Sequence, residues 1–367
     1  EIRSFCVDRY LLVRVYTDQG LIGNGEAGLW AHHGMVKVAV DELAEYFKGK
    51  NPLRIEHHYQ VVSRQTHFAG AVISAALSAI DVALWDIMGK SVGMPVYQLL
   101  GGKTRDKIKV FENISGNTEN CRVEDAKKHV ERGYTSLRMT PFFEGFEDKC
   151  ASQIIDEAVR MVAVVREAIG YQIDLGLEIH RNLRIEEAIT LARELEPFRI
   201  LYYEDPLAPE SVEALKIMTP NLRLPIATGE RFYSLQQFKE LIDGRLVSLI
   251  RPDLSLAGGF TQAKKIASVA EAAFVGVFPH LMGSAVNNSA FAHFAAVLPN
   301  YTHMESNLLP SYLDQIVDEQ MPIEKGYRIL TDRPGIGIEI NEEVLGDFPQ
   351  QKVKISGHFH ADGSVAH

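Results

Sequence analysis

The stretch Ile173–Pro206, IDLGLEIHRNLRIEEAITLARELEPFRILYYEDP, decides the fold class. It begins with a short apolar run, Ile173–Ile179, and continues through a segment of helical periodicity, Ile185–Leu195. It closes with a second apolar run, Ile200–Glu204. A strand, a helix and a second strand in this order are typical of a βαβ unit with parallel strands.

The same alternation continues on both sides of this unit. We expect strands at Lys107–Asn113, Ser136–Thr140, Ile173–Ile179, Ile200–Glu204, Pro225–Glu230, Leu246–Asp253, Ala273–His280 and Tyr301–Glu305. We expect helices at Val123–Arg132, Asp156–Ile169, Ile185–Leu195, Leu235–Ile242 and Thr261–Ala272. Eight apolar strands separated by helices predict a parallel α/β barrel of the TIM type.

The first 105 residues follow a different pattern. Residues 10–27 have the β-rich runs and the turn signal of a hairpin, and residues 35–47 and 71–89 have helical periodicity. We therefore predict an α+β domain over 1–105 and a barrel over 106–320, with the C-terminal segment 321–367 returning to the first domain.

Composition excludes several functional classes. The 367 residues carry a formal net charge of -10, which disfavours nucleic acid as a partner. Three distant cysteines, Cys6, Cys121 and Cys150, predict neither a disulfide framework nor a thiolate zinc site. The sequence has no run of about 18 apolar residues, and its first residues lack a signal-peptide core. We expect a soluble, reduced, cytoplasmic protein with no membrane partner.

Polar residues end six successive predicted strands. They are Glu178, Glu204, Glu230, Asp253, His280 and Glu305, separated by 26, 26, 23, 27 and 25 residues. A repeat of about 25 residues is one βα unit, so these side chains should meet at the C-terminal mouth of the barrel, where barrel enzymes place their active sites.

The first three of these residues suggest a metal site. Glu178, Glu204 and Glu230 offer oxygen ligands only, which suits Mg²⁺ rather than Zn²⁺. Without a cation, three neighbouring carboxylates would repel one another and shift towards protonation. Ordinary loop residues at strand ends are the alternative interpretation, which three consecutive repeats disfavour.

The remaining residues suggest acid–base chemistry. Asp253 precedes His280 by one strand and can orient its ring, which would make His280 a general base. His180 shares a strand face with Glu178 and can act as an acid, or it is a supporting hydrogen-bond partner. Glu305 would donate a hydrogen bond to an enediolate if crowding keeps it protonated.

Two other motifs carry weaker signals. Gly23-Asn-Gly25-Glu-Ala-Gly28 matches GxGxxG but follows a hairpin instead of opening a βαβ unit, so we do not expect dinucleotide binding. His32 and His33 lack cysteine or HExxH context and do not indicate zinc, although either can reach the site from the N-terminal domain.

Together these residues resemble a known family. The chain is similar to the mandelate racemase-like branch of the enolase superfamily, and within it to acid-sugar dehydratases of the galactonate dehydratase type. The matching segments, in order, are residues 78–90 (SAIDVALWDIMGK), residues 95–102 (PVYQLLGG), Glu178-Ile-His180, Glu204-Asp-Pro206, Gly229-Glu230-Arg231, Pro252-Asp253 and Pro279-His280.

This resemblance implies a capping domain over a modified (β/α)7β barrel with Mg²⁺ on the three glutamates. It implies that the His280–Asp253 dyad removes the C2 proton of a sugar acid, and that His180 assists loss of the 3-hydroxyl. The product would be a 2-keto-3-deoxy acid, and Glu305 would help to hold the enediolate. Relatives are often octamers, so we expect a homo-oligomer, either an octamer or a dimer.

The chain departs from the resemblance at two positions. Many relatives carry a Lys-x-Lys pair on the second barrel strand, where this chain has Arg138. The base on the opposite face is therefore missing, which favours dehydration over racemisation. The second departure is Glu178, since aspartate is commoner there. We expect Arg138 either to bind a substrate carboxylate or to balance the acidic site. We expect His33 and Arg64 to contact the substrate.

Two other functions remain compatible with the sequence. One is an epimerase or cycloisomerase on the same scaffold. The other is a binding or regulatory protein with little turnover, because a fold alone does not fix function.

Overall fold

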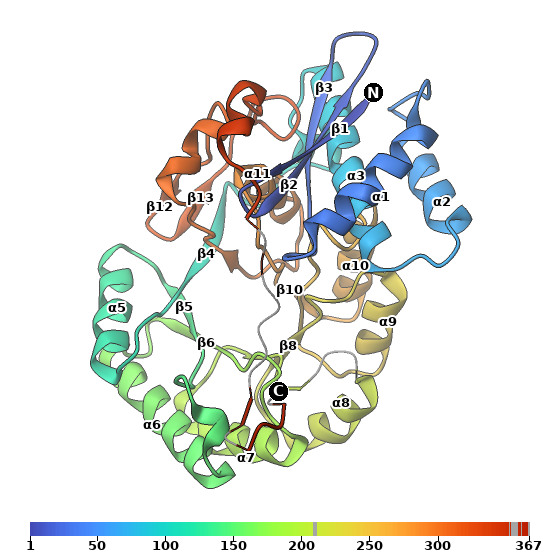
Figure 1. Ribbon diagram of the computed structural model, residues 1–367. Helices are drawn as coiled ribbons and strands as arrows, with labels where there is room; N and C mark the ends of the chain where they lie inside the picture. Colours follow the sequence, from blue (N-terminus) through green and yellow to red (C-terminus); the bar gives the residue numbers. More distant parts are fainter. Residues whose placement is uncertain (208–210, 352, 354–358, 361, 366–367) are drawn as a thin grey trace.

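The computed structural model describes residues 1–207, 211–351, 353, 359–360 and 362–365. Figure 1 shows an N-terminal α+β part above a ring of strands and helices. The predicted C-terminal segment extends over residues 352, 354–358, 361 and 366–367, and there the prediction lies outside the described residues.

The N-terminal domain is a three-stranded antiparallel sheet covered by helices. Its strands, in the order β1-β2-β3, are β1 (Ile2–Val7), β2 (Tyr10–Tyr16) and β3 (Ile22–Ala27). Its helices are α1 (His33–Phe47), α2 (Ile55–Gln65), α3 (Ala71–Val92) and α4 (Val96–Leu99). The predicted hairpin is therefore confirmed as β2 and β3, while β1 and α2 were not predicted from the sequence.

Helix α3 is the apolar helix of this domain. By length and composition it could cross a membrane, with a mean hydropathy of 1.7, but 67% of that window is buried inside the protein. Helix α3 can pack closely against β3 because two residues of that strand are glycines. A Cβ on Gly23 or Gly25 would collide with the backbone of Ala83 or Ala79 of α3. Burial of this kind is what a core helix shows.

The barrel, over the described residues, contains eight parallel strands and seven intervening helices. The strands are β4 (Lys107–Asn113), β5 (Ser136–Met139), β6 (Asp174–Glu178), β7 (Tyr203–Glu204), β8 (Ile226–Thr228), β9 (Leu249–Ile250), β10 (Gly276–Val277) and β11 (Met304–Glu305). The helices are α5 (Glu119–Glu131), α6 (Ala151–Ile169), α7 (Ile185–Leu195), α8 (Val212–Met218), α9 (Leu235–Asp243), α10 (Gly259–Ala272) and α11 (Ala285–Ala296). All eight predicted strands are present, while α8 and α11 were not predicted.

Pairing between first and last strands closes the ring. Strands β4 to β10 follow one another in parallel, and β11 pairs with β4. A parallel bridge between Val277 and Tyr301 joins β10 to the segment that enters β11. The result is the (β/α)7β barrel that the resemblance implied.

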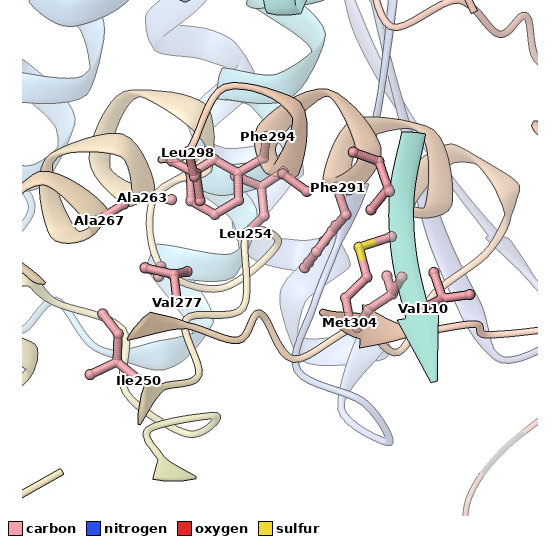
Figure 2. Close-up of a cluster of buried hydrophobic side chains, with 14 of the residues drawn as sticks. Val110, Ile250, Leu254, Ala263, Ala267, Val277, Phe291, Phe294, Leu298 and Met304 are labelled. Carbon is pink, nitrogen blue, oxygen red and sulfur yellow. The ribbon is translucent and has the colours of Figure 1, made fainter. Parts of the chain in front are cut away.

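Apolar side chains join this ring to its outer helices. Figure 2 shows Ile250, Val277 and Met304 of the strands below Phe291 and Phe294 of α11, and all five side chains are buried. Helix α11 is buried along its whole length. This explains why its weak amphipathic pattern gave no helix signal.

Short elements complete the chain. Strands β12 (Ile323–Glu324) and β13 (Tyr327–Ile329) form an antiparallel extension, with β13 pairing with β4. The 3-10 helices are Phe146–Asp148, Glu196–Phe198, Thr219–Asn221, Ser311–Ile316 and Glu342–Asp347. The cysteines Cys6, Cys121 and Cys150 are free.

The chain after β13 contacts the N-terminal domain. The Asn24 side-chain amide donates to the carbonyl of Ile338, and Arg14 forms an ion pair with Glu342 at 2.7 Å. The backbone N–H of Ile336 donates to the buried carboxylate of Asp86 on α3. Residues 336–342 are therefore packed against the N-terminal domain, whereas His360, further along the chain, lies beside the barrel, with its Nδ1 3.8 Å from Asp148 Oδ1.

Candidate active site

Parallel pairing brings the predicted metal ligands together. Glu178 and Glu204 are direct partners in the register of β6 and β7. Glu204 pairs with Ala227 of β8, so Glu230 follows at the same end of the next strand. Strands β6 and β7 end in glutamate and β8 ends two residues before one, so three carboxylates lie side by side at the mouth.

The three glutamates can hold one cation. One carboxylate oxygen from each of Glu178, Glu204 and Glu230 lies within 4.8 Å of the other two, and Glu204 is fully buried. Burial and the neighbouring Glu204 raise the pKa of Glu178 well above its ordinary value. Burial also acts to raise the pKa of Glu230, but the positive charges of His280, Arg251 and Arg181 lower it. Three carboxylate donors, one fully buried and two partly buried, suit a hard divalent ion such as Mg²⁺.

Arg138 of β5 lies against this acid cluster. Its Nη1 is 3.2 Å from Glu178 Oε2, 3.0 Å from Glu204 Oε2 and 3.5 Å from Glu305 Oε1. Burial lowers the pKa of Arg138, yet Glu204 and Glu178 raise it further, so the net shift is upward. A guanidinium held in this way stays protonated and cannot replace the missing lysine as a base.

Arg251 of the strand-end segment after β9 connects two acids. This fully buried side chain pairs through Nε with Glu204 Oε1 at 2.5 Å and through Nη2 with Glu305 Oε1 at 2.6 Å. Its guanidinium also stacks on Phe278, 4.0 Å from the ring centroid. Arg251 therefore couples a predicted metal ligand to Glu305.

The condition under which Glu305 would donate a hydrogen bond, its protonation, is contradicted. Burial favours protonation, but Arg251 and Arg138 outweigh it and lower the pKa of Glu305. Both carboxylate oxygens act as acceptors, since Oε1 faces Arg251 and Oε2 accepts the backbone N–H of Leu281 at 3.2 Å. The sequence analysis offered Arg138 as a counter-charge for these acids but gave Arg251 no role.

His280 and Asp253 form the expected pair. His280 Nδ1 lies 2.8 Å from Asp253 Oδ2, and Nε2 lies 3.8 Å from Glu230 Oε2. Burial alone would lower the pKa of His280, but Glu230 and Asp253 raise it to about 9. The second oxygen of Asp253 accepts from the N–H and hydroxyl of Ser255, at 2.8 and 2.6 Å. Asp253 thus fixes the orientation of the ring through Nδ1, and Nε2 faces the acid cluster.

His180 lies at the exposed rim of the site. Its backbone has a positive φ of 54°, and its N–H donates to Glu178 Oε1 at 2.7 Å. The surrounding protein and the neighbouring Arg181 lower the pKa of the ring, so the neutral form is favoured. The left-handed backbone turn lets this strand end contribute both its amide and its side chain.

The other two predicted substrate contacts lie in the N-terminal domain. His33 is buried at the start of α1, held by the backbone of Ala27 and Arg9, and burial lowers its pKa to about 4. It lines a surface pocket of about 320 Å³ with Gln350. Arg64 is exposed in the last turn of α2, where its charge acts on Glu56. None of these contacts joins them to the acid cluster.

Two site arginines received no role from the sequence. Arg251 precedes Asp253 by two residues, which places both on one face of the strand end, and that spacing was a usable signal. Arg181 bridges Asp205 and Glu230, with Nη1 2.8 Å from a carboxylate oxygen of each. The only sequence signal for Arg181 was its neighbour His180, whose predicted role indicated that this loop lies close to the site.

Comparisons with known proteins identify the family of the chain. Residues 2–101 match the N-terminal domain model of the mandelate racemase / muconate lactonizing enzyme family, and residues 122–344 match the enolase C-terminal domain-like model. A D-galactonate dehydratase of Verminephrobacter eiseniae is 35% identical, over 98% of this chain and 96% of that protein. Another, from Pectobacterium atrosepticum, is 36% identical over 92% of this chain and 90% of that protein.

Solved structures have the same fold. An enolase from Pantoea ananatis with bound D-gluconate and magnesium has a TM-score of 0.94 and 30% identity, covering 100% of this chain and 98% of that one. The fold and the acidic mouth define a member of the enolase superfamily. More narrowly, the chain belongs to the mandelate racemase / muconate lactonizing enzyme family, where it is similar to D-galactonate dehydratases.

Proposed function

We propose that this protein is a hydro-lyase that removes water from an aldonic acid and yields a 2-keto-3-deoxy acid. The observation that carries the proposal is the placement of His280, hydrogen-bonded to Asp253 at 2.8 Å and directed with its other ring nitrogen to Glu230, 3.8 Å away. A base next to a cation site is what removal of a proton α to a carboxylate requires. The D-galactonate dehydratases and the gluconate-bound relative support the substrate class.

Mg²⁺ is the proposed cofactor, held by Glu178, Glu204 and Glu230. When bound, it would supply positive charge against the substrate carboxylate and so lower the cost of the charge that develops after proton loss. A lysine or histidine base beside Mg²⁺ is general to the enolase superfamily and not particular to this chain. The residues present fit that ion because all three donors are oxygens.

His280 and His180 divide the proton transfers. His280 Nε2 takes the C2 proton, while Asp253 holds Nδ1 and stabilises the imidazolium. The C3–O bond then breaks, its electrons leave with the hydroxyl, and a proton from His180 completes the departing water. The remaining enol tautomerises to the ketone. An anionic substrate beside His180 raises the low pKa of its ring and favours the protonated form that this step needs.

Arg138 and Glu305 support the site without transferring protons. Arg138 is a cation that meets the substrate carboxylate or neutralises the ligand glutamates. Glu305 accepts from Leu281, the residue after His280, and so holds the base-bearing loop. We propose that His33 and Arg64 contact the substrate only when the N-terminal domain closes over the barrel.

A substrate screen tests the proposal. The protein is incubated with Mg²⁺ and a panel of aldonic and aldaric acids that includes D-galactonate and D-gluconate, and 2-keto products are detected with semicarbazide. We expect product with at least one aldonic acid, loss of product with EDTA and its return with Mg²⁺. Absence of product across the panel would falsify the dehydratase proposal.

The same samples decide between dehydration and isomerisation. Solvent deuterium at C2 of unconsumed substrate, with scrambled configuration, would identify an epimerase instead. Arg138 argues against that outcome, because its guanidinium is paired with Glu178 and Glu204 and leaves the opposite face without a base. Tight metal binding without turnover would identify a binding protein.

We also propose a cytoplasmic homo-oligomer, either an octamer or a dimer. The resemblance to the family supports it. Light scattering on the purified protein tests the assembly, and a monomer at micromolar concentration would contradict it.

A further inference from the structure

The GxGxxG-like segment of β3 opens no βαβ unit, yet its residues reach the catalytic dyad. Successive side chains of a strand point to opposite faces. Gly23 and Gly25 face α3, where no Cβ fits, and Glu26 faces the barrel. Glu26 is 1% exposed although it carries a carboxylate, so its position has to be explained by its partners.

Those partners lie in the loop after His280 and in the first turn of α11. Glu26 accepts the backbone N–H of Ser284 at 2.8 Å and its hydroxyl at 2.6 Å. It also accepts the N–H of Asn287 at 3.1 Å. Ser284 is the N-cap residue of α11, so one carboxylate of the N-terminal domain fixes the first turn of a barrel helix. Only three residues separate His280 from Ser284.

The same segment also reaches the loop after Asp253. The backbone N–H of Gly28 donates to the carbonyl of Ser255 at 2.9 Å. A Cβ at position 28 would lie 2.7 Å from Ser255 Oγ and 2.9 Å from its carbonyl oxygen, so only glycine permits this approach. Ser255 in turn donates twice to Asp253.

Two sets of contacts, one from β3 and one from Gly28 directly after it, thus converge on the segments that follow the two members of the dyad. We infer that Glu26 and Gly28 of the N-terminal domain are positioning residues. They hold the loops of His280 and Asp253 so that these two side chains stay within hydrogen-bond distance of each other. The inference rests on the proposed role of the dyad. Its physical basis is that a loop is held less precisely than a strand, and β3 is anchored on α3 and β2.

The effect on rate should be large relative to the change in structure. A displacement of about 1 Å at a reacting group can cost about 100-fold in rate. Such a displacement affects the proton-transfer step, while Mg²⁺ on Glu178, Glu204 and Glu230 and substrate binding are retained. A positioning role therefore predicts a fall in kcat without a matching rise in KM.

The test compares Glu26→Gln and Gly28→Ala with a matched control, Asp81→Asn. Asp81 is also a buried carboxylate of the N-terminal domain that accepts an N–H at the start of a barrel helix, that of Thr261 on α10 at 3.1 Å. Its partner therefore lies within α10, beyond the turn that holds Ser255. Steady-state kinetics use the sugar acid that the wild type dehydrates, Mg²⁺ affinity is measured by calorimetry, and crystal structures report the His280–Asp253 distance.

We expect Glu26→Gln and Gly28→Ala to lower kcat about 10-fold or more, with KM and Mg²⁺ affinity within about twofold of the wild type. We also expect the His280 Nδ1–Asp253 Oδ2 distance to exceed its present 2.8 Å. Asp81→Asn should lower the melting temperature similarly while its kcat stays within about twofold. Equal kcat losses in all three variants, or an unchanged dyad in both crystal structures, would overturn the inference.

A failure of the proposed reaction can be distinguished from a failure of the positioning role. If the wild type dehydrates no acid of the panel, dehydration is wrong, and the crystal structures alone decide whether Glu26 and Gly28 hold the dyad. If either variant does not fold, the other supplies the same distance measurement.

Discussion

His280 Nδ1 lies 2.8 Å from Asp253 Oδ2, on the loops of two neighbouring barrel strands. Asp253 accepts the hydrogen on Nδ1, so Nε2 is the nitrogen that accepts the substrate proton once the ring is neutral. Since burial would otherwise lower the pKa of His280, the raised value of about 9 depends on Glu230 and Asp253.

Replacing either member of the dyad should remove the base. We expect His280→Asn and Asp253→Asn to lower kcat by about 10²–10⁴-fold, the usual contribution of general base catalysis. Mg²⁺ affinity by calorimetry should be retained, because neither residue belongs to the three glutamates. The exposed His57→Asn is the control variant and should keep wild-type kcat. Wild-type turnover by Asp253→Asn would contradict the assignment.

Arg138 should determine how much bound Mg²⁺ contributes to the thermal stability of the protein. Its Nη1 lies 3.0–3.5 Å from Glu204, Glu178 and Glu305. In Arg138→Met, the unbalanced carboxylates repel one another, so the EDTA-treated protein should melt lower, by roughly 2–4 °C for each kcal/mol lost. Mg²⁺ should restore more of the melting temperature than it does in the wild type. Arg138→Lys keeps the charge, and equal Mg²⁺ shifts in all three proteins would refute the idea.

Arg251 should be a major determinant of stability. Arg251→Met leaves Glu204 and Glu305 without their buried partner, and breaking a buried ion pair typically costs about 3–5 kcal/mol. Urea unfolding measures this loss, and the double variant with Glu305→Gln should recover part of it. The partly exposed Arg333, paired with Asp318, is the control, since Arg333→Met should cost about 1 kcal/mol or less. Similar losses in both single variants would contradict the prediction.

His293 should contribute to loss of stability in acid. It is fully buried on α11, where Nδ1 accepts the N–H of Tyr97 and Nε2 donates to the carbonyl of Ile336, and burial lowers its pKa to about 4. The folded pKa lies below the unfolded value of 6.5, so this contribution is complete above pH 6.5 and falls as the pH decreases towards 4. The slope is at most about 1.4 kcal/mol per pH unit.

Unfolding free energies of wild type and His293→Gln between pH 7 and 4 provide the measurement. The variant is expected to start less stable and to lose stability less steeply. Parallel curves for the two proteins would show that His293 does not take up a proton on unfolding in this range.

Much of the barrel could be predicted because its signal is local. Strand β4 and helix α7 have the bounds expected from Lys107–Asn113 and Ile185–Leu195, since an apolar run and a helical period are properties of consecutive residues. Helix α11 could not be predicted in this way. It is buried on every side, so no polar face marks its period.

The candidate site, like the barrel, could be predicted only in part. The repeat of about 25 residues determined that Glu178, Glu204, Glu230, Asp253 and His280 share one end of the barrel, because each parallel strand delivers its last residue to the same edge. The charge state of Glu305 was decided by Arg138 and Arg251, which are 167 and 54 residues away in the chain and meet it only through barrel closure.

The sequence by itself therefore determined which acids and histidines meet at the mouth, because strand order and spacing are properties of the chain. Only the tertiary structure decided what each of them faces. The ionised state of Glu305 and the contacts of Glu26 and Gly28 with the dyad loops depend on side chains brought together from distant segments. Electrostatic and hydrogen-bond partners act over a few ångströms in space, and separation along the chain does not encode that distance.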